Sequence, residues 1–326
     1  MLILNEQEIK KILSMSEAIE VNELAYRAFS TGKAESPLRF NMQLDNSEDY
    51  TLFMPGYVSE TGGLGVKVVT ILPDNVKRNL PATQAAILLL DRETGVPSAL
   101  MGATYITALR TGAGTGVATK YLAREDASVA AIIGTGGMAP GQLEAICAVR
   151  DIKEVYVYNR TKDKAEKFVE DMKKGFRNDL TYYVTSSPEE AVRKADVVAT
   201  STSSPEPVVK YEWLKKGAHV NAVGAFNSSM QEVDEELVVR ADIRAVDGIS
   251  AASVPGDLSI PLKNKSINKE DLIEIGNLID QGVKGRPTVD GITFFKSVGI
   301  SAQDIAVAIA VLEKAKKEGE GMEISL

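Results

Sequence analysis

Three basic side chains in the first third of the chain stand among apolar or small residues. Arg39 lies in the segment PLRF, Lys67 in the apolar run LGVKVVT, and Arg110 in ALRTGAG. A buried charge is costly unless it has an opposite charge or a chemical role. Three cations that meet at one pocket would suit a small carboxylate. Lys67 could equally be an edge-strand lysine that reaches water, and Arg110 could form a buried ion pair or bind a cofactor phosphate.

A glycine-rich turn after a strand-like run is typical of a dinucleotide site. Residues 129–133 (VAAII) predict a buried parallel strand, followed by GTGGMA, which fits G-x-G-x-x-A, then a helix and a second strand over 154–158. Gly134 allows the tight turn, Gly136 lets backbone N–H groups approach a pyrophosphate, and Ala139 lets the helix pack on the strand. The phosphates would lie at the helix N-terminus. The turn residues expected at the cofactor are Gly134, Thr135, Gly136, Gly137 and Met138.

The end of the second strand bears on the choice between NAD(H) and NADP(H). Dinucleotide folds that prefer NAD place an acidic residue there for the ribose 2′-hydroxyl, whereas this chain has Asn159, Arg160 and Thr161, with Lys164 close behind. The planar guanidinium of Arg160 can bind a 2′-phosphate, although it could also be a solvated residue at the start of the next helix. We therefore predict NADP(H), with NAD(H) as the weaker alternative.

Composition is that of an ordinary globular enzyme. The chain has 326 residues, 44% hydrophobic and 25% charged, enough for two domains. A net charge of −8 argues against a nucleic-acid or anionic-membrane surface. The single cysteine, Cys147, excludes a disulfide framework and a cysteine-based metal site, so no metal is expected and a reducing cytoplasm is predicted. We expect neither a signal peptide nor a membrane span.

The pattern along the chain predicts an α/β protein. After residue 124, short apolar strands alternate with helices, which indicates a doubly wound parallel sheet. The later part is expected to hold a loose stretch around Pro255 and Pro261, a helix over 269–279 and an amphipathic helix over 302–317. The first third is mixed, with helices to about residue 29, several strands between 40 and 101, and a helix over 105–122.

The chain resembles the ornithine cyclodeaminase/mu-crystallin family over essentially its whole length. The matching segments are SPLRF, LFMPGY, GVKVVT, NLPATQAAILLLDRETGVPSALM, ATYITALRTGAGTGVATKYLA, GTGGMAPGQLEA, GAHVNAVGA and FKSVGISAQDIAVA. The resemblance implies a Rossmann-type sheet (124–298) inserted in a mixed α+β substrate-binding and dimerisation domain (1–123 plus 299–326). It also implies a homodimer.

The resemblance implies roles for individual residues. In the family two arginines and a lysine hold the substrate carboxylate, and these align with Arg39, Arg110 and Lys67; Lys67 and Arg110 are the catalytic candidates, and Met54 is a further substrate contact. The remaining expected cofactor contacts, from the resemblance and from a polar run at a strand end, are Thr83, Gln84, Arg110, Thr111, Thr200, Ser201, Thr202, Val223 and Ser297.

One departure from the family pattern decides the expected reaction. Cyclodeaminases have an aspartate after the HxNAxG strand, where this chain has Phe226, which cannot move protons. Together with Thr70 and the NRTK segment, this resembles the mu-crystallin-like ketimine reductases. The expected reaction is NADPH-dependent reduction of Δ1-pyrroline-2-carboxylate or Δ1-piperideine-2-carboxylate to L-proline or L-pipecolate. Arg39 and Arg110 would hold the carboxylate, and Lys67 would keep the imine nitrogen protonated.

Three alternatives remain open: an ornithine cyclodeaminase, an alanine dehydrogenase, and a non-catalytic ligand-binding protein that retains NADPH. Two further residues receive expectations of their own. His219 is expected to be a hydrogen-bonded core residue rather than a general acid. Asp304 is expected to cap the last helix with Ser301; the alternative is that it orients Lys67 or a water near the nicotinamide.

Overall fold

The computed structural model describes residues 1–45, 49–282 and 285–325. The chain divides into two compact units, unit 1 (Met1–Arg110 with Ile300–Leu326) and unit 2 (Thr111–Gly299). The division falls inside helix α3 (Thr104–Leu122), whereas the sequence predicted a boundary after this helix. The second half of α3 belongs to unit 2 because it packs there, with Gly112 against the backbone of Gly141. The roles assigned to the two predicted domains stay predictions.

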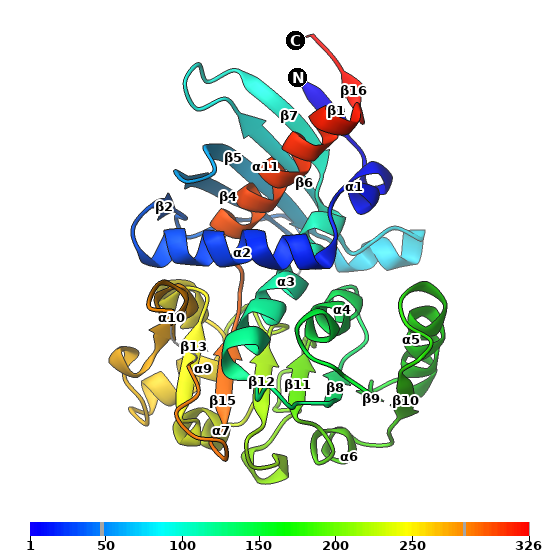
Figure 1. Ribbon diagram of the computed structural model, residues 1–326, viewed down its shortest axis with the longest axis vertical. Helices are drawn as coiled ribbons and strands as arrows, with labels where there is room; N and C mark the ends of the chain where they lie inside the picture. The colour runs from blue at the N-terminus through cyan, green and yellow to red at the C-terminus, as the bar shows by residue number, and fades with distance from the viewer. Residues whose placement is uncertain (46–48, 283–284, 326) are drawn as a thin grey trace. The chain divides into compact units, whose positions relative to one another are not determined.

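Unit 1 is built on a mixed sheet with the strand order β16-β1-β7-β6-β5-β4-β2 (Figure 1). Strand β3 pairs with β4. Neighbouring strands are antiparallel except β1 and β7, which are parallel. The strands are β1 (Leu2–Leu4), β2 (Ala34–Glu35), β3 (Phe40–Gln43), β4 (Tyr50–Val58), β5 (Gly63–Ile71), β6 (Thr83–Leu90), β7 (Pro97–Gly102) and β16 (Met322–Glu323).

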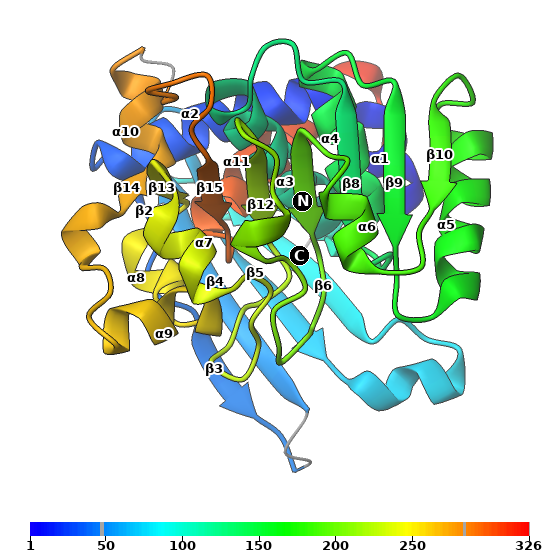
Figure 2. The same ribbon diagram turned by 90° about the horizontal axis from the view of Figure 1, so that it is seen from below.

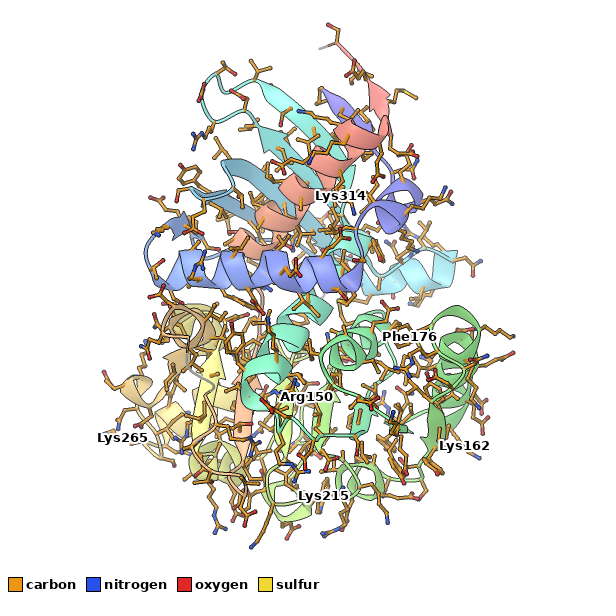
Figure 3. All side chains as sticks on the ribbon, viewed as in Figure 1. Arg150, Lys162, Phe176, Lys215, Lys265 and Lys314 are labelled. Carbon is orange, nitrogen blue, oxygen red and sulfur yellow. The ribbon has the colours of Figure 1, made fainter. Side chains whose placement is uncertain are left out.

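One helix, α11 (Ser301–Glu318), covers a face of this sheet and packs on β4, β5 and β6 and on α2 (Met15–Ser30). The strands leave room for it because Gly63 and Gly65 of β5 have no side chain where Ile305 of the helix lies. At the outer edge of this packing, Lys314 of α11 forms an ion pair with Glu17 of α2 at 2.7 Å (Figure 3). The other helices of unit 1 are α1 (Glu6–Ile12) and the 3-10 helix η1 (Pro73–Arg78).

Unit 2 holds a parallel sheet with the strand order β10-β9-β8-β11-β12-β15-β13-β14 (Figure 2). The order reverses direction between β8 and β11, which is the switch point at which doubly wound sheets bind nucleotides. The predicted fold class is confirmed. The strands are β8 (Val129–Ile133), β9 (Glu154–Tyr158), β10 (Thr181–Val184), β11 (Val197–Thr200), β12 (His219–Ala222), β13 (Ile243–Val246), β14 (Ile273–Glu274) and β15 (Thr293–Lys296).

The helices of unit 2 follow its strands. Arg150, after α4, donates to the carbonyl oxygens of Thr119, Ala123 and Arg124 and so caps the C-terminal end of α3 (Figure 3). The helices are α4 (Ala139–Val149), α5 (Lys162–Gly175), α6 (Pro188–Val192), η2 (Tyr211–Trp213), α7 (Glu235–Arg240), α8 (Ile249–Ala252), α9 (Gly256–Lys263), η3 (Lys269–Asp271) and α10 (Ile275–Asp280).

Two expectations for unit 2 were wrong. The stretch around Pro255 and Pro261 is not loose: it forms α8 and α9, with Pro255 as the N-cap of α9 and Pro261 inside it. The predicted helix over 269–279 is interrupted by β14, because Ile273 pairs with Ala245 of β13. The apolar residues of the segment 269–279 therefore belong to a strand and two short helices.

Candidate active site

Lys67 lies in the middle of β5, a central strand between β4 and β6, and its side chain is 1% exposed. Burial alternates along β5, so Lys67 shares the buried face with Gly63 and Gly65, which contact α11. Of the two interpretations of this lysine, the solvent-reaching edge residue is therefore wrong. Lys67 is a buried cation with its charge directed at the helix.

Its partner is Asp304, in the first turn of α11. Lys67 Nζ lies 2.6 Å and Arg110 Nε 2.9 Å from the same oxygen, Asp304 Oδ1, and the carboxylate is 0% exposed. The second oxygen, Oδ2, is buried and has no hydrogen-bond partner among the described residues. The expectation that Asp304 caps the helix was wrong, because the side chain of Gln303 accepts the Ile300 N–H instead.

Ser301, the other residue of the expected cap, bonds elsewhere: its hydroxyl donates to the carbonyl oxygen of Pro55 in β4. It also forms a hydrogen bond with the Ser36 hydroxyl. The two contacts hold the start of α11 to β4 and to the segment that follows β2.

The remaining predicted substrate residues lie around this ion cluster. Met54 in β4 is the direct cross-strand neighbour of Lys67 and is buried. Arg39, half-buried just before β3, is near enough for its charge to act on Lys67. Unit 1 therefore joins Lys67 and Arg110 at one carboxylate, that of Asp304, and Arg39 lies near enough for its charge to act on Lys67.

The environment changes the acidity of the lysine. Burial, which penalises the charged form, lowers the pKa of Lys67 from 10.5 to about 7, and the charges of Arg110 and Arg39 act in the same direction. Asp304 opposes them through its charge and its hydrogen bond. A lysine with this pKa can donate or accept a proton near neutral pH, which an ordinary surface lysine cannot.

Unit 2 holds the glycine turn. Gly134 adopts a φ of +88°, and a side chain there would collide with Ser201 and Thr202. By contrast, a Cβ at Gly136 or Gly137 would meet nothing within 4 Å among the described residues, so open space lies in front of the turn. Two polar atoms near the turn have unsatisfied hydrogen-bonding capacity: the hydroxyls of Thr135 and Thr200 are buried without a hydrogen bond in the described structure. This donor set and space fit a dinucleotide pyrophosphate.

The end of β9 is close to this turn. The Thr135 N–H donates to Asn159 Oδ1 at 3.3 Å, and Asn159 Nδ2 donates to the Thr161 carbonyl at 3.0 Å. Arg160 is exposed, and Lys164 lies exposed on the first turns of α5. The strand end itself, residues 159–161, therefore presents an amide and an arginine and no carboxylate, and the first turn of α5 adds both Asp163 and Lys164.

Sequence reasoning missed an acidic residue that ties the neighbouring strand ends together. Glu232, fully buried, accepts hydrogen bonds from the Thr202 N–H at 2.6 Å, the Gly224 N–H at 2.7 Å and the Ala225 N–H at 3.0 Å. Burial raises its pKa. The loops after β11 and β12, which carry the predicted contacts Thr202 and Val223, are thus fixed to one carboxylate. A lone glutamate beside valine gave no pattern that could have revealed it.

A second buried carboxylate holds the end of β15. Asp247 Oδ2 accepts the Ser297 hydroxyl at 2.8 Å, the Val298 N–H at 2.7 Å and the Gly299 N–H at 2.6 Å. The predicted cofactor residue Ser297 therefore has its hydroxyl proton engaged within unit 2. Thr83 and Gln84, at the start of β6, belong to unit 1, so their predicted cofactor contacts stay predictions, as does that of Thr111 in α3.

The single histidine is a core residue, as predicted. His219 is buried, with Nδ1 2.9 Å from the Thr293 hydroxyl and Nε2 3.1 Å from Asn221 Oδ1. Burial lowers its pKa to about 3. It therefore stays neutral at physiological pH and is not a general acid.

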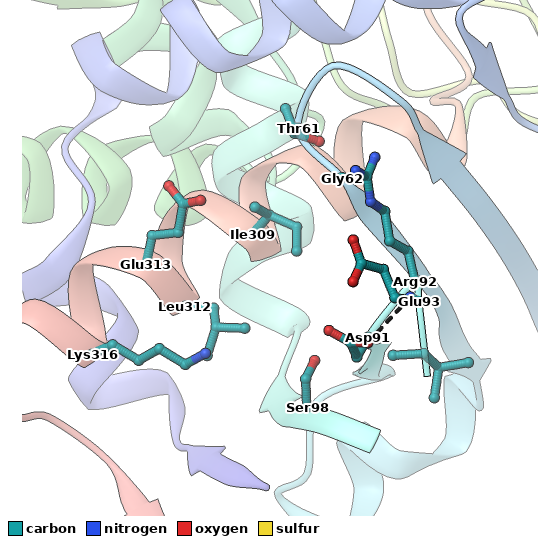
Figure 4. A pocket seen from close by; sticks show the side chains of 11 residues that line it. Thr61, Gly62, Asp91, Arg92, Glu93, Ser98, Ile309, Leu312, Glu313 and Lys316 are labelled. Carbon is teal, nitrogen blue, oxygen red and sulfur yellow. Dashed lines mark hydrogen bonds between the residues drawn. The ribbon is translucent and has the colours of Figure 1, made fainter. Parts of the chain in front are cut away.

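A surface hollow of about 240 Å³ in unit 1 lies apart from these residues (Figure 4). It is formed by the end of β6 and the C-terminal half of α11, and its rim includes Asp91, Arg92, Glu93 and Lys316. None of the predicted site residues lines it. The described helices include none that is long and apolar enough to cross a membrane; the location of the protein in the cell stays a prediction.

Comparison with known proteins places the chain among enzymes of amino-acid metabolism. The profile of the ornithine cyclodeaminase/mu-crystallin family matches residues 1–319. The Δ1-pyrroline-2-carboxylate reductase of Bacillus cereus is 40% identical, over 99% of each chain. The solved structure of the Thermococcus litoralis enzyme of the same name, in complex with NADH and L-proline, is 39% identical and superposes with a TM-score of 0.94, covering 99% of this chain and 100% of that one. An archaeal alanine dehydrogenase dimer with bound NAD is 38% identical, with a TM-score of 0.92 over 99% and 98% of the two chains.

Proposed function

The chain belongs to the ornithine cyclodeaminase/mu-crystallin family, and from this premise we propose that it reduces the carbon–nitrogen double bond of Δ1-pyrroline-2-carboxylate to give L-proline. It is an oxidoreductase that uses a nicotinamide cofactor. The six-membered homologue, Δ1-piperideine-2-carboxylate, is the second substrate of the same class. The reductases that share about two fifths of its sequence support this choice.

The observation that carries the proposal is the ion cluster of unit 1. The substrate has a carboxylate next to an imine, and the cluster offers both partners: arginines for the carboxylate, and a lysine with a pKa of about 7 for the imine nitrogen. Arg110 and Arg39 bind the carboxylate through charge-assisted hydrogen bonds. Met54 packs beside Lys67 as an apolar wall.

Lys67 keeps the imine nitrogen protonated, directly or through a water. Protonation draws electrons from the neighbouring carbon, so that carbon becomes the electrophile. The bound cofactor supplies the hydride for this carbon. The electron pair of the double bond then becomes the lone pair of the amine nitrogen, which retains the proton.

The residues proposed to hold the cofactor are those of unit 2: the turn from Gly134 to Met138, the strand end at Asn159, and the loop from Thr200 to Thr202. We infer that NADP(H) is preferred, because Arg160 and Lys164 offer positive charge for a 2′-phosphate and the strand end at residues 159–161 has no acidic residue. The two solved relatives named above bind NADH and NAD, so NADH is the cofactor to measure beside NADPH.

Alanine dehydrogenase activity is the second candidate, since an archaeal enzyme of that name is 38% identical to this chain. It would need pyruvate and ammonia in place of a cyclic imine. Ornithine cyclodeamination is disfavoured by Phe226, which stands where cyclodeaminases have a proton-transferring aspartate. The test is to follow oxidation of NADPH and NADH with each imine, and with pyruvate plus ammonia. Absence of turnover with both imines, by folded protein over neutral and mildly acidic pH, would refute the proposal.

We also infer a homodimer, formed through the face of the unit 1 sheet that α11 does not cover. On that face Pro55, Val66, Leu88 and Leu100 form one continuous cross-strand row. Each is at least partly exposed in the single chain, with Leu100 at 37%. An apolar sheet face of this kind is usually covered by a second protein surface. The dimeric alanine dehydrogenase relative supports a second copy of the chain.

A further inference from the structure

We propose that Asp304 is a positioning residue for imine reduction: its carboxylate keeps the Lys67 side chain charged and aims it, from the oxygen that it shares with Arg110. The inference rests on the proposed function, in which Lys67 protonates the imine nitrogen. Asp304 itself acts through the cations that it holds and not on the substrate.

The geometry gives Asp304 control over both cations. Lys67 Nζ and Arg110 Nε approach the same Oδ1, at 2.6 and 2.9 Å, from β5 and α3 respectively. Because one carboxylate oxygen pairs with both cations, it determines where each of the two nitrogen atoms lies. Because Asp304 is 0% exposed, water does not screen these interactions.

Among the described residues, the charges that act on Lys67 come from three segments, and one of these segments favours the ammonium. Arg110 on α3 and Arg39 before β3 oppose it, as does burial itself, whereas Asp304 on α11 supports it. The balance holds the pKa of Lys67 at about 7. Without the carboxylate, burial and the arginines would leave the lysine neutral at physiological pH and unable to donate a proton.

The single histidine and the single cysteine do not titrate near neutral pH. Burial lowers the pKa of His219, the single histidine, to about 3, and raises that of Cys147, the single cysteine, to about 12. An enzyme inflection near neutral pH that vanishes in a Lys67→Met variant can therefore be assigned to Lys67.

The kinetic experiment compares the pH dependence of kcat/KM for imine reduction in the wild type and in Asp304→Asn, which keeps the shape and removes the charge. We expect the alkaline fall in kcat/KM to begin at lower pH in the variant. Each tenfold weakening of proton binding lowers kcat/KM about tenfold on the alkaline side, with a much smaller change below both pKa values. Asp304→Glu, which keeps the charge, should restore the wild-type inflection. Lys314→Gln, which removes an ion-paired charge farther along the same helix, should leave it in place.

A second readout does not depend on activity. Lysine Nζ resonances of ¹⁵N-labelled protein, with Lys67 assigned by its loss in Lys67→Met, report the lysine pKa directly. Asp304→Asn should lower it. Arg110→Met, which removes an opposing cation, should raise it and serves as the second variant if Asp304→Asn does not fold. A Lys67 pKa that stays at its wild-type value in these variants would overturn the inference. Normal shifts in a protein that reduces no imine would instead refute the proposed function alone.

Discussion

Lys67 and Arg110 donate to one and the same atom, Oδ1 of Asp304, at 2.6 and 2.9 Å. Neither cation can move without changing the environment of the other, although one is expected to serve the imine nitrogen and the other the carboxylate. The two ends of a small substrate would therefore be bound by groups whose spacing is set by a third side chain. This coupling leads to the first prediction.

Replacing Lys67 by methionine should lower kcat/KM for imine reduction by roughly 10²–10⁴-fold, the range that a positioned acid contributes. Lys67→Arg is the matched control: it can still pair with Asp304, but a guanidinium does not give up a proton near neutral pH. Both variants should lose activity, and circular dichroism should show both folded. Retention of most activity by Lys67→Arg would mean that Lys67 supplies charge and no proton.

The cofactor prediction concerns the end of β9. Arg160→Ala should raise KM for NADPH by about tenfold or more while KM for NADH changes little, because a charge-assisted bond contributes about 1.5–3 kcal/mol. Asn159→Asp should harm NADPH use further through repulsion of the 2′-phosphate, and should aid NADH. Steady-state kinetics with both cofactors measure this. An equal response to the two cofactors in both variants would contradict the assignment of Arg160 to the 2′-phosphate.

Substitution of two glycines by alanine should affect two different properties, cofactor affinity in one case and thermal stability in the other. At Gly136 an added methyl group meets no atom within 4 Å, so Gly136→Ala should fold normally but bind the cofactor several-fold more weakly by crowding the pyrophosphate. At Gly112 the methyl group would collide with the backbone of Gly141, so Gly112→Ala should lower the thermal midpoint despite the better helix propensity of alanine. Melting curves and cofactor titration separate the two effects.

The free energy of unfolding should depend on pH in the acidic range because of His219. Its pKa is about 3 in the folded chain against 6.5 ordinarily, so between these values the unfolded state holds a proton that the folded state lacks. The free energy of unfolding therefore falls as pH decreases through this window, by at most about 1.4 kcal/mol per pH unit from this group. His219→Gln should remove that component. Denaturant unfolding at several pH values gives the difference; parallel curves for both proteins would count against it.

The proposed dimer predicts the effect of a charge on the uncovered sheet face. Val66→Asp or Leu88→Asp should yield monomers in analytical ultracentrifugation, because an aspartate in an apolar interface has no partner there. Glu93→Gln, at the rim of the surface hollow, is the control and should leave the assembly unchanged. A dimer of unaltered stability in both aspartate variants would place the interface elsewhere.

The sequence was informative wherever a pattern was local. The strand before Gly134 and the one before Asn159 were predicted with their observed bounds, because apolar runs flanked by turn residues identify buried parallel strands. The segment 269–279 was misread because periodicity alone cannot distinguish one continuous helix from two short helices with a strand between them. The strand forms because Ile273 pairs with Ala245. Tertiary pairing decided the outcome there.

For the site residues too, the sequence was informative only where the pattern was local. Lys67 and Arg110 were found because a charge among apolar residues is conspicuous within one segment. Asp304 was misassigned because its partners lie far away along the chain, and its spacing from Ser301 imitates a cap. Glu232 was missed because most of its partners are backbone N–H groups of two loops, which cannot be read from residue types.

The discontinuity of unit 1 has a consequence for synthesis on the ribosome. Lys67 is made 237 residues before Asp304, and the whole of unit 2 emerges between them. During most of translation the sheet of unit 1 therefore lacks both the helix that covers it and the counter-ion of its buried lysine. Unit 2 is one uninterrupted stretch of chain, so it can fold before unit 1 is complete. A nascent chain stalled before residue 300 should be open to protease in its first part and resistant in its second, so the final segment completes the fold and the charge balance of the site in one step.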